Sequence, residues 1–198
     1  MIIPIRLYGD QCLKDEAYDV ELEEGDNVVD LVNDLFETLY ASGTGVGLAA
    51  TQIGVPLRVF VAKHEEFESE FINPELIFQS KEMEFVEEGC LSIPTVGINV
   101  NRSKNIKLKY FVLDGDGKLV EKIEEFEGYV ARIIQHEIDH LDGICITDKV
   151  KGLARTILQP KLRKITQGRT QYRYPTLHKS HPEYKKVIEE VISKYIKE

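Results

Sequence analysis

The chain has 198 residues, of which 42% are hydrophobic, and its 34 acidic against 25 basic residues give a formal net charge of −9 at pH 7. It is long enough for one domain to bury a substantial core, no apolar run approaches the roughly 18 residues of a membrane helix, and the first residues lack a secretion signal. Because Cys12, Cys90 and Cys145 have no disulfide-framework spacing, we expect a single domain, residues 1–198, in the reducing cytoplasm, with Cys12 and Cys145 as structural thiols.

The first predicted element is a helix over residues 27–40, where apolar side chains recur at spacings of three and four. Residues 45–54 follow it, and within them Gly45, Gly47 and Ala50 fit the G-x-G-x-x-A pattern of a dinucleotide-binding loop. That loop must follow a strand, so the preceding helix excludes nucleotide binding. The glycines instead expose backbone that can pair with an extended peptide, and Gln52 offers an amide donor near a reacting centre. A tight turn with a surface glutamine is the alternative.

The strands are predicted where short runs of β-branched, aromatic and other apolar residues lie between turn residues. A turn at residues 114–117, Asp-Gly-Asp-Gly, joins the last two of them as a hairpin. The predicted strands are 58–62, 75–78, 106–113 and 119–123. Strands gathered before one internal helix indicate the α+β class.

Between these strands, the run Glu88-Gly89-Cys90-Leu91 places a thiol beside a glycine. An unpaired cysteine is most often a small buried hydrophobe, and Cys90 has this interpretation when it is taken alone. The second interpretation is a metal ligand, because a thiolate suits soft or borderline divalent ions. Gly89 favours that role by letting the backbone approach closely.

The helix predicted over residues 128–141 carries His136-Glu137-x-x-His140. Residues four apart on a helix lie about 5–6 Å from one another at Cβ, so the two imidazoles can bind one ion. Glu137 lies beside the first of them and is placed to act as a general base. Such a site needs a third protein ligand, and we expect it from Cys90 because the downstream histidines lack the metzincin spacing. The alternative is a chance pattern on a solvated or core face.

The rest of the chain is predicted as a tail, residues 166–198, that follows a catalytic core, residues 1–165. Apolar spacing predicts a helix over 182–196 in this tail, and it docks on the same chain or pairs between chains. Residues 149–173 contain eight basic residues and no acidic residue. This basic segment is either a solvated helix face or a contact with ribosomal RNA.

The segments 45–54, 88–92 and 135–143 together resemble peptide deformylase, the enzyme that removes the formyl group from the N-terminal methionine of new bacterial polypeptides. They occur in the order found in that family. Thr51 stands where the family usually carries proline. The resemblance implies an α+β fold of mostly antiparallel strands surrounding a central metal-binding helix that carries the His-Glu-x-x-His motif, with N-terminal and C-terminal helices.

The resemblance also implies a role for each residue of the site. The expected metal ligands are Cys90, His136 and His140, with Glu137 for proton transfer and Gln52 and the Leu91 backbone N–H for the oxyanion. The expected substrate-binding residues are Val46, Gly47, Gly89, Tyr129 and Ile133. Three of these, Val46, Tyr129 and Ile133, would form a pocket for the methionine side chain, and the alternative is that they are ordinary core residues.

One thiolate and two imidazoles suit iron(II), zinc, nickel or cobalt, and the resemblance implies iron(II). The expected partners are formyl-methionyl nascent peptides, with the ribosome as a further candidate through residues 149–173, and no membrane. Two other functions share part of the pattern. A metallopeptidase would use the same helix but leave Cys90 and Gln52 without a role. A noncatalytic metal-binding or ribosome-associated protein would have no need of Glu137.

Overall fold

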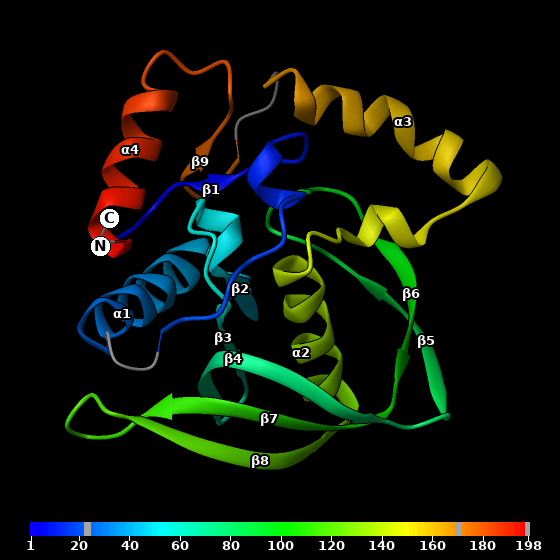
Figure 1. The fold of residues 1–198 in the computed structure, drawn as a ribbon. Coiled ribbons are helices and arrows are strands. Elements are labelled where there is room, and N and C mark those ends of the chain that lie inside the picture. Colours follow the sequence, from blue (N-terminus) through cyan, green and yellow to red (C-terminus); the bar gives the residue numbers. More distant parts are fainter. Residues whose placement is uncertain (22–24, 169–171, 197–198) are drawn as a thin grey trace.

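The computed structural model describes residues 1–21, 25–168 and 172–196, and it has an α+β architecture (Figure 1). The helices are α1 (Gly25–Ser42), α2 (Gly128–Leu141), α3 (Gly152–Thr166) and α4 (Tyr184–Tyr195), with short 3-10 helices η1 (Gln11–Leu13), η2 (Ala50–Ile53) and η3 (Ile146–Lys149). The strands are β1 (Ile5–Arg6), β2 (Gly47–Ala49), β3 (Val59–His64), β4 (Phe67–Gln79), β5 (Met83–Glu88), β6 (Ile98–Ser103), β7 (Asn105–Leu113), β8 (Leu119–Glu127) and β9 (Thr176–Leu177).

The main sheet has the strand order β2-β3-β4-β7-β8, and every neighbouring pair in it is antiparallel. The strands β5 and β6 form a separate antiparallel pair, whereas β1 and β9 are parallel. The predicted strands 75–78, 106–113 and 119–123 lie inside β4, β7 and β8, and 58–62 begins one residue before β3. The expected mostly antiparallel α+β fold is therefore confirmed, with β1–β9 as the parallel exception.

The β5–β6 pair is missing from the sequence prediction, because the side chains of β5 do not follow the alternation of a half-buried strand. Residues Met83 to Glu87 are all exposed, and only Glu88 at the end of β5 is buried. An acidic run of this kind has no apolar face from which a strand could be inferred. The pairing depends on β6, in which Ile98, Val100 and Arg102 face inward.

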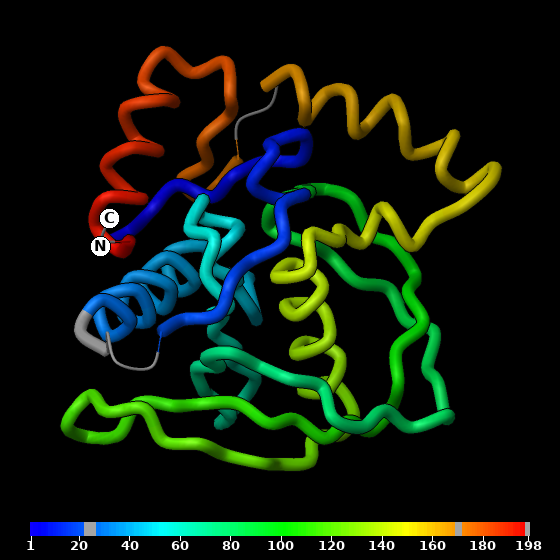
Figure 2. Tube along the Cα trace, viewed as in Figure 1, coloured from blue at the N-terminus to red at the C-terminus, as the bar shows by residue number. Residues whose placement is uncertain are grey.

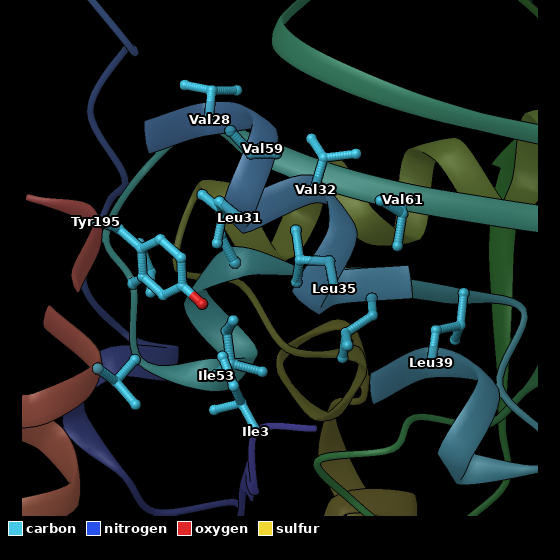
Figure 3. Packing of buried hydrophobic residues seen from close by; sticks show 14 of the residues in the cluster. Ile3, Val28, Leu31, Val32, Leu35, Leu39, Ile53, Val59, Val61 and Tyr195 are labelled. Carbon is cyan, nitrogen blue, oxygen red and sulfur yellow. The ribbon is translucent and has the colours of Figure 1, made fainter. Parts of the chain in front are cut away.

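The strand β3 is buried on both faces and separates two cores. Val59 and Val61 face α1, where they pack with Leu31 and Leu35 (Figure 3). The alternate residue Phe60 faces α2 and stacks on Phe71 of β4 at a ring-centroid distance of 4.5 Å. The two helices therefore pack on opposite faces of β3, α1 against its odd-numbered residues and α2 against its even-numbered ones.

The helix α2 spans the residues that the sequence predicts, and all of its residues after Val130 except Asp139 are buried, between the main sheet and the β5–β6 pair (Figure 1). Its Ala131, Ile134 and Ile138 pack in the core with Phe60 and Tyr110 of the sheet. Gly143 ends this region with a φ of 68°, and a Cβ there would overlap the carbonyl oxygen of Lys14. Close backbone approach therefore requires glycine at this position.

The tail returns to the N-terminal part of the chain (Figure 2). The strand β9 pairs with β1 through Ile5–Thr176 and Arg6–Leu177, and the Ile5 N–H donates to the Pro175 carbonyl at 3.0 Å. Helix α4 docks on α1, because the buried Tyr195 hydroxyl donates to Asp34. This arrangement is the same-chain docking that was one of the two expectations for this helix.

The helix α4 begins two residues later than the predicted start at residue 182. The reason is a turn at His181, whose carbonyl accepts from the Tyr184 N–H at 3.0 Å and whose ring accepts from the Glu183 N–H at 3.2 Å. Pro182 therefore precedes the helix rather than starting it. Within the part of the chain that the structure describes, no helix combines the length and the apolar character needed to span a bilayer.

Candidate metal centre and substrate cavity

The structure brings together the three residues expected as metal ligands. Cys90 lies just after β5, and His136 and His140 lie one turn apart on α2. One donor atom from each lies within 4.8 Å of the others. The Cys90 Sγ is 3.2 Å from the His140 Nε2, and the imidazole ring centroids are 5.0 Å apart. This triangle of donor atoms has the size of a site for one ion.

The orientation of His136 is fixed by Glu88. The His136 Nδ1 lies 2.9 Å from a Glu88 carboxylate oxygen, so Nδ1–H donates and Nε2 is left to face the candidate site. Burial alone would raise the pKa of Glu88, but hydrogen bonds from His136 and Arg102 hold that pKa at about 2. The carboxylate is therefore ionised and can only accept.

Glu88 is held by two buried arginines. Arg102 donates to both carboxylate oxygens at 2.9 Å, and Arg132 donates to one of them at 2.8 Å. Arg102 also contacts Asp139 and the Gln135 carbonyl. This bidentate geometry fixes Glu88, which in turn fixes the imidazole of His136. The sequence prediction assigned no role to this network, although the alternation of β6 places Arg102 on the inward face.

The donor set fits a divalent cation. Burial opposes a charge on His136, yet Cys90 and Glu88 raise the pKa of its imidazole to about 10, so the site attracts positive charge. At His140, burial together with the neighbouring His136 lowers the pKa well below 6.5, which leaves a neutral imidazole. A thiol, a neutral imidazole and a second imidazole backed by a carboxylate match the ligands of zinc or iron sites.

Glu137 is buried beside this triangle and also lines the cavity. Burial raises the pKa of its carboxyl group to about 7, which poises it to exchange a proton near neutral pH. Its Oε2 has no hydrogen-bonding partner among the described residues. The space that the carboxyl group occupies exists because residue 47 is glycine: a Cβ there would lie 2.8 Å from the Glu137 Cδ.

The amide of Gln52 is held in one orientation. Its Oε1 accepts from the Ala49 N–H at 2.9 Å, so its Nε2 faces the opposite way, 3.1 Å from the Ser92 Oγ and 3.8 Å from the Cys90 Sγ. Next to Gln52, the hydroxyl of Thr51 donates to the His140 carbonyl at 3.2 Å. The residue in the usual position of proline thus ties η2 to the end of α2.

Leu91 follows Cys90 and lies on the wall of the cavity. Its backbone N–H forms no hydrogen bond with another described residue, whereas its carbonyl accepts from the Tyr174 hydroxyl at 2.6 Å. The N–H is therefore available to a bound molecule. The contact with Tyr174 was not foreseen, because no sequence pattern links residue 91 to the tail.

A cavity of about 570 Å³ opens onto Cys90, His136 and Glu137. All of the residues expected to bind substrate line it, namely Val46, Gly47, Gly89, Tyr129 and Ile133. Ile133 is buried, whereas Tyr129 is 47% exposed and lies at the rim. The tail contributes Tyr172, Arg173 and Tyr174 to the same wall. The volume and the mixture of apolar and polar groups suit a short peptide segment.

Two of the cysteines lie away from the cavity. Cys145 is buried in the core between β6 and α3, and Cys12 packs against the same core. Burial raises the pKa of both thiols, to about 12 for Cys145. These thiols are therefore protonated and unreactive at neutral pH, in keeping with structural roles.

A buried helix that presents a His-Glu-x-x-His motif to a thiol and an open cavity places the protein among hydrolases with a candidate metal centre. Residues 2–156 match the family model described as polypeptide deformylase, and the chain belongs to this family. Members of the family remove the N-formyl group from nascent peptides.

Relatives of known name agree with this assignment. The peptide deformylase of Pseudothermotoga lettingae is 43% identical, covering 84% of this chain and 94% of its own. The crystal structure of peptide deformylase from Thermotoga maritima is 40% identical with a TM-score of 0.69, covering 77% of this chain and 99% of that one. A Met-Ala-Ser-bound peptide deformylase from Acinetobacter baumannii is 30% identical with a TM-score of 0.70, covering 76% and 99%.

Proposed function

We propose that this protein is a metal-dependent hydrolase that removes the N-formyl group from the N-terminal methionine of newly synthesised polypeptides and releases formate. The observation that carries the proposal is the position of Glu137. This carboxyl group is buried, has a pKa of about 7, and opens onto the same cavity as Cys90 and His136. A noncatalytic metal-binding protein would gain nothing from an unpaired buried carboxyl group beside its ligands.

The proposed ligands are Cys90, His136 and His140. Iron(II) is the proposed ion, and the same donors accept zinc, nickel or cobalt. A divalent ion held there would supply positive charge that makes water more acidic and stabilises an oxyanion. The thiolate adds negative charge to the site and weakens that effect, so a general base close by becomes more important.

Glu137 is the proposed general base and general acid. It accepts a proton from the attacking water, whose oxygen forms a bond to the formyl carbon. The carbon–nitrogen bond then breaks, and Glu137 returns the proton to the departing nitrogen, which leaves formate and a free N-terminal amine. Gln52 Nε2–H and the Leu91 N–H are proposed to donate to the formyl oxygen as it becomes negative.

The substrate backbone is proposed to lie along β2. This strand is at an edge of the main sheet, and Gly47 on it lines the cavity. An extended peptide can therefore add to that edge, with Gly89 on the opposite wall. The methionine side chain is proposed to occupy the space between Val46, Tyr129 and Ile133. The related Acinetobacter baumannii deformylase holds Met-Ala-Ser, the peptide that this reaction would leave.

The basic segment 149–173 divides into parts with different surroundings. Lys149 and Arg155 contact Asp139 and Asp148, Arg169 lies outside the described residues, and Arg173 lines the cavity. Lys161, Arg163 and Lys164 on α3 are exposed. They are the proposed contact with ribosomal RNA, and a solvated helix face is the alternative. Charge reversal at these three residues should abolish co-sedimentation with ribosomes. Unchanged co-sedimentation would instead favour the solvated helix face.

The proposed location is the cytoplasm, where nascent chains are made.

The test is formate release by protein loaded anaerobically with iron(II). Formyl-Met-Ala-Ser should release formate, and acetyl-Met-Ala-Ser should not release acetate at a comparable rate. The acetylated peptide distinguishes a deformylase from a general peptidase or acylase. Absence of formate release from protein with one bound ion per chain would exclude the proposed function.

A further inference from the structure

The C-terminal tail reaches the turn that carries both Cys90 and Leu91. The Ile93 N–H donates to the Cys90 carbonyl at 3.0 Å, which closes a four-residue turn over residues 90–93. Leu91 and Ser92 are its central residues, so the thiol donor and the proposed oxyanion donor belong to one turn. Any movement of this turn shifts both groups relative to α2.

The turn is fixed from three sides. The Gln52 Nε2 donates to the Ser92 Oγ at 3.1 Å, and the Tyr8 N–H donates to the Ser92 carbonyl at 2.8 Å. The third contact is the Tyr174 hydroxyl, which donates to the Leu91 carbonyl at 2.6 Å. That carbonyl belongs to the central peptide of the turn, whose rotation distinguishes one turn type from another. Tyr174 therefore opposes rotation of this peptide.

Tyr174 can serve as a fixed support because the residues after it are anchored. Pro175 accepts from the Ile5 N–H at 3.0 Å, and Thr176 and Leu177 form β9 against β1. The Tyr174 ring packs against the core that contains α1 and η2. The family model ends at residue 156, so this support comes from the part of the chain beyond the matched region.

We propose that Tyr174 is a positioning residue that holds the Cys90–Ile93 turn, and with it the Leu91 N–H, in the geometry required for the reaction. The proposal rests on the proposed deformylase function for its catalytic consequence. It gives the tail a role in the active site in addition to packing. The hydroxyl acts on the turn and does not itself contact the reacting atoms.

Tyr174→Phe removes the hydroxyl and keeps the ring. The matched control is Tyr184→Phe, because the Tyr184 hydroxyl also comes from the tail and donates to a residue away from the cavity, Asp10, at 2.8 Å. In metal-replete protein, Tyr174→Phe should lower kcat for formyl-Met-Ala-Ser by about fivefold to twentyfold, in line with one lost hydrogen bond. KM and the affinity for Met-Ala-Ser should stay within about twofold of wild type, and Tyr184→Phe should leave kcat unchanged.

Amide hydrogen exchange of Ile93 tests the same contact without turnover. Loss of the Tyr174 hydroxyl should increase this exchange about fivefold or more, whereas Tyr184→Phe should not change it. Unchanged Ile93 exchange in Tyr174→Phe would overturn the proposal, whatever the enzyme's activity. An equal fall of kcat in both variants would also overturn it, because the effect would then be general destabilisation. If Ile93 exchanges faster in Tyr174→Phe but the wild type releases no formate, then Tyr174 supports the turn and the deformylase function is wrong.

Discussion

The carboxylate of Glu88 lies 2.9 Å from the Nδ1 of His136, and two buried arginines hold the same carboxylate. Contacts within the protein therefore hold the imidazole of His136 in one orientation. Glu88→Gln keeps the shape of the side chain but removes the negative charge that the His136 N–H faces. Affinity for a divalent ion should fall by about 10-fold to 100-fold, as is typical when such a partner of a metal ligand is lost.

Competition with a chromophoric chelator measures this affinity. Glu82→Gln is the matched control, because Glu82 is exposed and pairs only with Lys104 in the described residues. Equal metal affinity in the Glu88 and Glu82 variants would show that the Glu88–His136 contact does not support metal binding.

Arg102 should contribute strongly to stability. Its buried guanidinium pairs with Glu88 and Asp139. Arg102→Met leaves Glu88 with Arg132 and Asp139 with Lys149, and the free energy of unfolding should fall by up to about 3–5 kcal/mol, the usual loss when one partner of a buried pair is removed. Arg102→Lys keeps the charge but loses the bidentate contact, so it should lie between wild type and Arg102→Met. Urea unfolding with equal m-values makes the comparison.

The matching surface substitution is Lys104→Met, which breaks an exposed pair with Glu82. It should leave the urea midpoint unchanged, because exposed pairs contribute little. If Arg102→Met also left the midpoint unchanged, the network around Glu88 would not stabilise the fold.

Gly47→Ala should separate activity from folding. The added methyl group would lie 2.8 Å from the Glu137 Cδ, so the Glu137 side chain must move away from its place beside the ligands. We expect kcat to fall by about 100-fold or more, comparable to the loss of a general base, while the bound metal is retained. Gly115→Ala is the control, since its methyl group would meet nothing within 4 Å. Normal kcat in Gly47→Ala would contradict the placement of Glu137.

Asp34 should give a stability contribution that depends on pH. Burial alone would raise the pKa of Asp34, but hydrogen bonds from Lys194, the N-terminal amine and Tyr195 lower it below 3.8. The unfolded state binds a proton first as the pH falls. The stabilisation is therefore complete well above pH 3.8 and is lost as the pH falls through the folded-state pKa.

Asp34→Asn should accordingly lower the urea midpoint at about pH 7, and its difference from wild type should shrink steadily from about pH 5 to about pH 2. Urea titrations at a series of pH values measure the trend. A difference that stayed constant over this range would mean that the contacts of Asp34 with α4 do not depend on its charge.

Much of the fold is predictable where the hydrophobic pattern is strong. The bounds of α2 follow from its apolar spacing and from Gly143, and β7 follows from its alternation of buried and exposed residues. The three expected ligands also come together as predicted in the structure. A fixed helical spacing sets two of them, and the third follows from the affinity of a thiolate for such an ion and from the lack of a suitably spaced downstream histidine.

The remaining features depend on tertiary contacts that leave no local pattern. The strand β5 has an acidic, exposed sequence and exists through its pairing with β6. The buried Glu88–Arg102 pair leaves no signal in the sequence, because the strand register places Arg102 opposite Glu84 and isolated charged residues normally indicate surface. Tyr174 contacts Leu91 across 83 residues of sequence, and the two-residue strand β9 that anchors it is too short to show periodicity.

The central claim is that Glu137 transfers the proton in a metal-dependent deformylation. The most direct measurement is formate release from formyl-Met-Ala-Ser by wild type and Glu137→Gln, each loaded to the same measured metal content. The substitution preserves shape and removes the basic group, so kcat should fall by at least about 100-fold while metal content and the unfolding midpoint stay near those of wild type. Near-normal turnover by metal-replete Glu137→Gln would contradict the account.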